Sequence, residues 1–158
     1  MINVEDRLSK EIIGAAIEVH RHLGPGLLES AYEKCLCKEL KIRDIVFERQ
    51  KPLAVVYKGI TLDCGYKLDK VVNGKVILEL KSVNKIESIH DAQLLTFLKL
   101  ADLKLGILIN FNVPILKEGI QRIVNNPCPT VGGFETFRSL RLCGELFLFR
   151  LVRVKITY

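Results

Sequence analysis

With 158 residues, of which 49% are hydrophobic and 27% charged, the chain has the length and composition of a folded domain and not those of a disordered protein. No apolar run approaches the ~20 residues of a membrane span, and the first residues lack the apolar core of a signal peptide, so we expect a cytoplasmic protein with no membrane partner. The net charge of +6 is compatible with a polyanionic partner but does not demand one.

The first part of the chain shows helical periodicity. Apolar residues recur at helical spacing over residues 5–23, and Gly24-Pro25-Gly26 ends the pattern. A second helix is predicted over about 27–41. Its predicted core face consists of Leu28, Ala31, Cys35, Leu36 and Leu40.

Residues 45–83 are rich in β-branched and aromatic side chains, which favours strands. The runs are Ile45–Glu48, Leu53–Tyr57, Thr61–Val72 and Lys75–Val83, separated at Lys51-Pro52, Lys58-Gly59 and Asn73-Gly74. Asn-Gly supplies the positive φ angles of a two-residue turn, so the last two runs form a predicted hairpin. The last run is apolar on both faces, which indicates a buried strand.

Two further elements are predicted before residue 126. Ser88 is the expected N-cap of a helix that continues to Asp102, with Leu94, Leu95, Phe97 and Leu98 on its core face. Lys104–Phe111 is almost wholly apolar, which indicates a central strand covered on both faces. Residues 117–125 fit either an edge strand or a helical turn.

A change of character at Asn126 divides the chain into a domain over 1–126 and a C-terminal extension over 127–158. Pro127-Cys128-Pro129 marks the break, and alternation over residues 152–158 resembles an amphipathic strand.

Charged residues lie on the predicted hairpin. Asp69 lies on its first strand, and Glu79 and Lys81 point the same way on its second. A buried, unpaired carboxylate costs several kcal/mol, which a metal ion or a matched cation offsets. Asp69, Glu79 and the main-chain carbonyl of Leu80 are ligands for an oxygen-seeking divalent ion, beside which Lys81 would serve the attacking water or the transition state. The alternative is a structural ion pair of Lys81 with Asp69 or Glu79.

A Gly-x-x-Glu-x-x-Tyr string, Gly26, Glu29 and Tyr32, opens the second helix. Glu29 and Tyr32 are three residues apart and share one helix face. By itself the string reads as an acid favoured by the helix dipole and a half-buried aromatic. Beside the hairpin, Glu29 becomes the extra carboxylate that a second metal ion or a metal-bound water would use.

Together these motifs resemble one known family. GPGLLESAY, Asp69 with Glu79-Leu80-Lys81, HDAQLLTFLKL and LGILINFNVP are similar to the GxxExxY proteins of the PD-(D/E)XK nuclease superfamily, over roughly residues 4–125. The resemblance implies an α/β (α+β) fold with an α-β-β-β-α-β core, in which a mixed sheet with an antiparallel meander is flanked by helices. It also implies Mg²⁺ as the usual ion, with Mn²⁺ as the alternative.

The resemblance carries further residues. It implies that Gln93, on the covering helix, lies beside the metal site. Phe97 stands where relatives often have tyrosine, and Lys70 stands where they commonly have an apolar residue. In that position Lys70 would tighten DNA contact or compete for Asp69.

The implied function is a Mg²⁺-dependent nuclease, a hydrolase of phosphodiester bonds. Its implied site residues are Asp69, Glu79, Lys81, Glu29 and Gln93, with Asp69, Glu79, the Leu80 carbonyl and Glu29 around the metal. The alternatives are a catalytically silent module of nuclease fold that binds nucleic acid or a partner protein, and a structural Asp69–Lys81 salt bridge. The expected partner is nucleic acid, with DNA favoured over RNA, and a homodimer would extend the contact with DNA.

Overall fold

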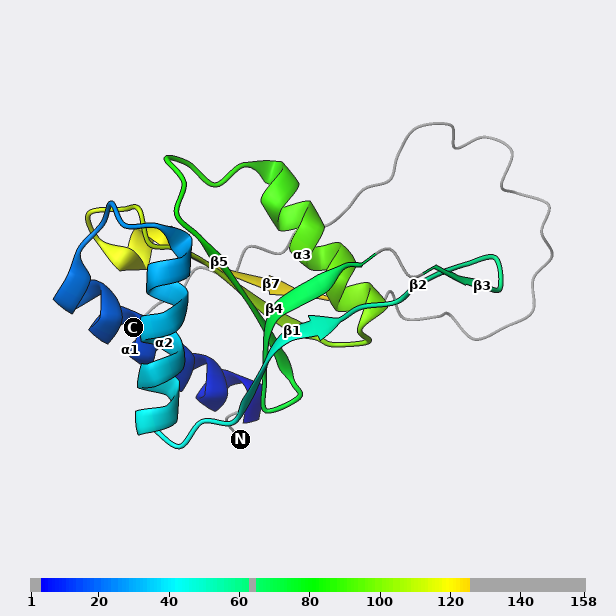
Figure 1. The fold of residues 1–158 in the computed structure, drawn as a ribbon, viewed down its shortest axis with the longest axis horizontal. Helices are drawn as coiled ribbons and strands as arrows, with labels where there is room; N and C mark the ends of the chain where they lie inside the picture. Colours follow the sequence, from blue (N-terminus) through cyan, green and yellow to red (C-terminus); the bar gives the residue numbers. More distant parts are fainter. Residues whose placement is uncertain (1–3, 63–64, 126–158) are drawn as a thin grey trace.

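The computed structural model describes residues 4–62 and 65–125 and has helices on both faces of a mixed sheet (Figure 1). Its elements are α1 (Val4–Leu23), α2 (Glu29–Ile42), β1 (Phe47–Pro52), β2 (Val55–Tyr57), β3 (Ile60–Leu62), β4 (Lys67–Val72), β5 (Val76–Lys81), α3 (Ser88–Leu100), β6 (Leu105–Asn110), the 3₁₀ turn η1 (Leu116–Gly119) and β7 (Ile120–Val124). The main sheet has the order β1-β4-β5-β6-β7, and β2 pairs with β3 in a separate hairpin. Only β5 and β6 pair in parallel within this described sheet. The predicted α+β class with an antiparallel meander is confirmed.

The core lies in two layers, one on each face of the sheet. On one face α1 and α2 pack against alternate residues of β5 and β6, and on the other face α3 packs against the intervening ones. All six residues of β6 are buried, as are the first five of β5. The prediction that these two strands are covered on both faces is therefore confirmed. Polar side chains in the buried positions of these strands are shielded from solvent by the packed helices.

The hairpin of β4 and β5 turns at Asn73-Gly74 as predicted, but Val72 pairs with Val76, so the connection has three residues, with Lys75 as the third, rather than two. Asn73 and Gly74 have φ angles of 50° and 66°, and the Lys75 N–H donates to the Val72 carbonyl at 3.0 Å. Two central residues with positive φ match the right-handed twist of the flanking strands. The local Asn-Gly signal therefore sets the connection between the two strands that carry the acidic residues.

Two strand predictions were wrong. The expected run Thr61–Val72 is not one strand, because β3 ends at Leu62 and Gly65, with a φ of 68°, precedes β4. The first strand was expected over Ile45–Glu48 with Lys51-Pro52 as a break after it, but β1 spans Phe47–Pro52 and includes both residues. Pro52 is accommodated because β1 is an edge strand of the described sheet, where a missing N–H costs no ladder bond.

The helix predictions needed smaller corrections. Leu28, expected on the core face of α2, is 79% exposed because it precedes the first helical residue. The N-cap of α3 is Glu87, not Ser88, and the helix ends at Leu100 rather than at Asp102, whose φ is 52°. Residues 117–125 were expected to form either a helical turn or an edge strand, and the region contains both, η1 followed by the edge strand β7.

The predicted extension over 127–158, including the strand pattern of 152–158, lies outside the described residues. Within the part of the chain that is described, no helix combines the length and apolar character of a membrane span.

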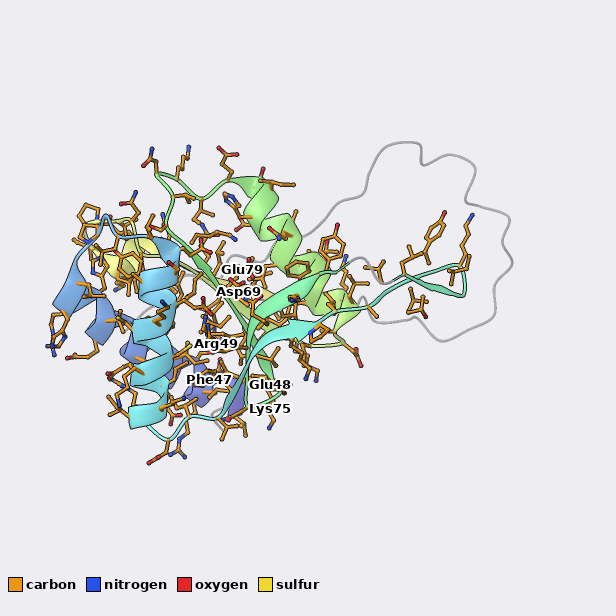
Figure 2. All side chains as sticks on the ribbon, in the orientation of Figure 1. Phe47, Glu48, Arg49, Asp69, Lys75 and Glu79 are labelled. Carbon is orange, nitrogen blue, oxygen red and sulfur yellow. The ribbon has the colours of Figure 1, made fainter. Side chains whose placement is uncertain are left out.

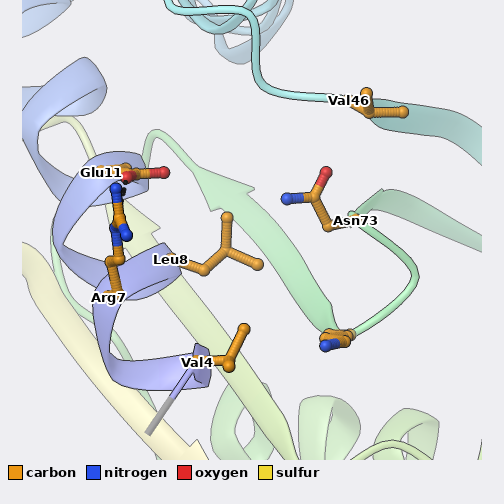
Figure 3. A pocket seen from close by; sticks show the side chains of 7 residues that line it. Val4, Arg7, Leu8, Glu11, Val46 and Asn73 are labelled. Atoms are coloured by element: carbon orange, nitrogen blue, oxygen red, sulfur yellow. Dashed lines mark ion pairs between the residues drawn. The ribbon is translucent and has the colours of Figure 1, made fainter. Parts of the chain in front are cut away.

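A hollow lies between the start of α1 and the turn that joins β4 to β5 (Figure 3). Its lining residues are Val4, Arg7, Leu8, Glu11, Val46, Asn73 and Lys75. Asn73 lies in the turn and Lys75 directly follows Gly74, whereas Asp69 is the third residue of β4, four residues before Asn73. This hollow is therefore separate from the acidic residues of the hairpin.

Candidate active site

Asp69 and Glu79 lie opposite each other where β4 and β5 stop pairing. The paired positions end at Lys70 and Leu78, one residue before them. Beyond that point the Asp69 side chain replaces the backbone partner, since its Oδ2 accepts the Leu80 N–H at 3.3 Å. Figure 2 shows Asp69 and Glu79 together in the middle of the molecule. The end of the ladder thus opens a gap between the strands that is lined by carboxylates.

The Leu80 carbonyl faces the same gap. The N–H and C=O of a strand residue point toward the same neighbouring strand. Because the Leu80 N–H is turned toward Asp69, the Leu80 carbonyl also faces β4, whereas the carbonyl of Lys81 points the other way and accepts the Phe111 N–H at 2.9 Å. Two carboxylates and one main-chain oxygen therefore border this gap.

Glu79 is buried, with 5% of its surface exposed, and only one of its oxygens is paired. Lys81 Nζ donates to Oε1 at 2.9 Å, while Oε2 is buried with no hydrogen-bond partner among the described residues. Burial raises the pKa of Glu79, and the negative charge of Asp69 raises it further, against the opposing effect of Lys81. The lysine thus compensates only part of the charge.

Lys81 remains a cation in this setting. Burial by itself lowers its pKa, but the hydrogen bond with Glu79 and the charges of Glu79, Glu29 and Asp69 together outweigh burial and raise the pKa. The predicted ion pair of Lys81 is therefore made with Glu79, on the same strand, and the alternative of an Asp69–Lys81 bridge is wrong.

Glu29 approaches the site from the first residue of α2. Its pKa is raised by burial first and by the charge of Asp69, while Lys81 lowers it. The preceding loop is attached to the end of β5, because Ser82 Oγ donates to the Leu27 carbonyl at 2.6 Å. Nothing in the sequence pattern singles out Ser82 except its position directly after Lys81, and sequence analysis missed it.

Tyr32 fixes the same loop from inside the protein. Its hydroxyl donates to the Gly24 carbonyl at 2.7 Å and accepts the Leu27 N–H at 3.0 Å. The ring is stacked on Phe111, with a centroid distance of 4.5 Å. The expectation of a half-buried aromatic was wrong, because Tyr32 is completely buried. Gly26 has a φ of 99°, which favours glycine, so the Gly-x-x-Glu-x-x-Tyr string holds the loop that presents Glu29.

Lys70 does not enter this site. Side chains alternate along β4, so Lys70 points away from Asp69, and it is completely buried. Its Nζ lies 3.4 Å from Glu33 Oε1, within ion-pair distance but without hydrogen-bond geometry, and Arg49 donates to the same oxygen at 2.9 Å. Both predicted roles, contact with DNA and competition for Asp69, are therefore wrong. Sequence analysis missed Glu33, whose signal is its position one turn after Glu29.

The remaining predicted residues lie on α3. Gln93 is exposed, and Phe97 is buried with its ring tilted against Tyr66 at a centroid distance of 6.3 Å. The Glu87 N–H donates to His90 Nδ1 at 3.0 Å, so His90 contributes to the start of the helix.

The donor set fits a hard divalent ion. Within 4–62 and 65–125, no three histidine, cysteine, aspartate or glutamate side chains form a group that could hold a metal, so Glu29, Asp69 and Glu79 do not make a closed cage. Mg²⁺ does not require one, since it is commonly held by one or two carboxylates and keeps several waters or substrate oxygens. Glu79 Oε2, which has no hydrogen-bond partner among the described residues, together with Asp69 and the Leu80 carbonyl, could hold an ion in that way.

Comparison with known proteins agrees with this arrangement. No curated protein and no solved structure matches the chain. The family model of the PD-(D/E)XK nuclease superfamily matches residues 6–123, from the first turn of α1 into β7, and thus spans the whole hairpin and α3. Membership in the narrower GxxExxY group stays a prediction. The chain belongs to the PD-(D/E)XK nuclease superfamily.

Proposed function

We propose that this protein is a Mg²⁺-dependent nuclease that hydrolyses phosphodiester bonds of nucleic acid, with DNA as the favoured substrate. The observation that carries the proposal is Glu79, a buried carboxylate with one oxygen on Lys81 and the other without a partner in the described chain. A group kept in this state raises the free energy of the protein unless a ligand completes it. Superfamily membership supplies the reaction class.

Asp69, Glu79 and the Leu80 carbonyl would hold the ion, which when bound stabilises negative charge on the phosphate and lowers the pKa of water. Lys81 keeps its positive charge beside Glu79, so it would contact a non-bridging phosphate oxygen and stabilise the charge that grows in the transition state. Glu29, with its pKa raised, would accept a proton from the attacking water at the edge of the site. Gln93 would orient the substrate from α3.

The test is cleavage of labelled single-stranded and double-stranded DNA and RNA with Mg²⁺ or Mn²⁺. Wild-type protein is compared with Glu79→Ala and Lys81→Ala, and with Glu48→Ala as a control, because Glu48 is an exposed acid on β1. We expect cleavage by wild type and the control and its loss in both site variants, with folding intact by circular dichroism. Isothermal titration with Mg²⁺ and Mn²⁺ accompanies the assay.

Silence on every substrate, together with no heat on titration of either ion, would sink the proposal. Metal binding with no cleavage would instead leave the silent binding module as the function. Cleavage that survives Glu79→Ala would place the chemistry elsewhere in the chain.

A further inference from the structure

The β2–β3 hairpin projects from the body of the protein on the side away from α1 and α2 (Figure 1). Its strands are joined by Lys58 and Gly59, with φ angles of 48° and 83°, which form a tight two-residue turn. The hairpin makes a two-stranded sheet of its own and is not hydrogen-bonded into the main sheet. We call residues 55–62 the arm.

The arm exposes apolar and aromatic side chains. Tyr57 pairs with Ile60, so these two share one face, and they are 59% and 63% exposed. Val56, on the opposite face, is 63% exposed. A two-stranded hairpin is marginal without packing, and apolar side chains on a projecting element mark a contact surface.

The charge of the arm favours a polyanion. The arm, residues 55–62, contains one lysine, Lys58, and no acid. Lys58 Nζ lies 5.3 Å from the centroid of the Tyr57 ring, so a cation and an aromatic face are presented together. Among the described residues, neither Lys58 nor Lys67 forms an ion pair.

The arm also leads directly to the candidate active site. Tyr66, 51% exposed, and Lys67 follow it at the start of β4, and Asp69 lies two residues further along. A nucleic acid whose phosphate lies at Asp69 would therefore run along Lys67 and Tyr66 toward the arm. Basic residues interleaved with aromatic faces are the arrangement that binds unstacked bases and their phosphates.

We propose that the arm is a nucleic-acid clamp. Tyr57 and Tyr66 stack on unstacked bases, and Lys58 and Lys67 contact the phosphates beside them. This inference rests on the proposed function, because it assigns the bases next to the bond cleaved at Asp69 and Glu79. Unstacked bases occur in single strands and in opened duplexes, and the test separates the two. A second copy of the chain is the weaker fit, since facing arms would bring their lysines together.

Binding is measured by fluorescence anisotropy without metal, in full-length Glu79→Gln protein, on a labelled single strand, a paired duplex and a duplex with a central mismatch. The arm variants are Tyr57→Ala, Lys58→Glu and Ile60→Ala. Lys10→Glu and Ile42→Ala are matched controls, because Lys10 is exposed on α1 and Ile42 is 62% exposed against 63% for Ile60. Melting temperatures check that each variant folds.

We expect Tyr57→Ala to weaken single-strand binding about 5- to 100-fold. Lys58→Glu should weaken single-strand binding about 10-fold and reduce the slope of log affinity against log salt concentration by about one, the value of one phosphate contact. The controls should stay within about twofold. An equal loss on the mismatched duplex, but not on the paired one, would extend the clamp to opened duplexes; a loss on the single strand alone would restrict it to single strands.

Unchanged binding in all arm variants would overturn the clamp, and dissociation of a dimer by Ile60→Ala would then assign the arm to a second copy. This result is distinct from failure of the proposed function. If the protein cleaves no substrate but the arm variants bind nucleic acid more weakly, the clamp is supported and the nuclease proposal fails. If the protein cleaves nucleic acid and the arm variants bind it as tightly as wild type, the nuclease is supported and the clamp fails.

Discussion

Two neighbouring residues of β4 lead to two different charge clusters. On one face Asp69 joins Glu79 and Lys81, and on the other Lys70 joins Glu33 and Arg49 (Figure 2 labels Arg49 and Asp69). Both clusters contain a partly or fully buried acid beside a lysine. In the second, the burial that raises the pKa of Glu33 is outweighed by Arg49 and Lys70, and the pKa is lowered; in the first, burial and Asp69 raise the pKa of Glu79.

The opposite directions of the two pKa shifts follow from the partners of each acid. Two cations share Oε1 of Glu33, so its charge is stabilised by the fold itself. Glu79 has one lysine, a neighbouring acid and an oxygen without a partner among the described residues. A perturbed acid with a specific charge partner is a functional-site candidate, and of these two acids Glu79 is the one with a buried oxygen that has no hydrogen-bond partner among the described residues.

The largest expected difference between the clusters is in activity. Glu79→Gln should reduce cleavage about 10³-fold or more, because it removes a carboxylate ligand of the ion that stabilises charge in the transition state. Glu33→Gln keeps the shape of the structural acid and should stay within about 10-fold of wild type. Single-turnover cleavage with both variants measures this. Equal losses in the two variants would contradict the distinction.

The second prediction concerns stability, and here the large effect is expected in the Glu33 cluster. Glu33→Ala leaves Lys70 buried without its acid, and we expect a loss of about 3 kcal/mol in the free energy of unfolding. Lys70→Met alone should change it by about 1 kcal/mol or less, because Glu33 keeps Arg49. Urea denaturation of both single variants and of the double variant tests this. The double variant should regain most of the loss, and a double variant as unstable as Glu33→Ala would refute the buried pair.

The third prediction connects the loop to the site. Tyr32→Phe keeps the stacking on Phe111 but removes the bonds to Gly24 and Leu27, so we expect a loss of about 1–2 kcal/mol in stability. Cleavage should fall about 10-fold if that loop positions Glu29. In a Glu29→Gln background the effect of Tyr32→Phe on cleavage should vanish while its effect on stability persists. Additive effects on cleavage would reduce Tyr32 to a core residue.

The sequence specified the parts of this site that depend on local pattern. Alternation and the Asn73-Gly74 turn predicted that Glu79 and Lys81 face one way on a buried strand, next to the strand of Asp69. It could not specify partners brought from a distance. The stacking of Tyr32 on Phe111 and the hydrogen bond from Ser82 to Leu27 join segments far apart in the chain, and no periodicity records them.

Lys70 shows the same limit from the other side. Its position after Asp69 indicated a role in the site, but its partner Glu33 lies on α2. The packing of that helix, which the sequence pattern does not show, determines on which face of the sheet Lys70 finds its charge partner. Gly65 likewise divides an apolar run that a pattern reads as one strand, because its positive φ interrupts the extended backbone.

The smallest expected effect is a dependence of stability on pH, and it has opposite signs in the two clusters. The folded pKa of Glu33 is lowered, so its contribution is present above the unfolded pKa and is lost as the pH falls through the folded value. The folded pKa of Glu79 is raised, so its contribution is present below the unfolded pKa and is lost as the pH rises through the folded value.

Metal-free Glu79→Gln should therefore melt above wild type at pH 8, by roughly 2–4 °C, and the difference in melting temperature should shrink toward pH 4. Saturating Mg²⁺ should reverse the order by stabilising wild type alone. Thermal melts across pH with and without the ion measure both, and a metal-free gap that widens in acid would show that Lys81 already satisfies Glu79.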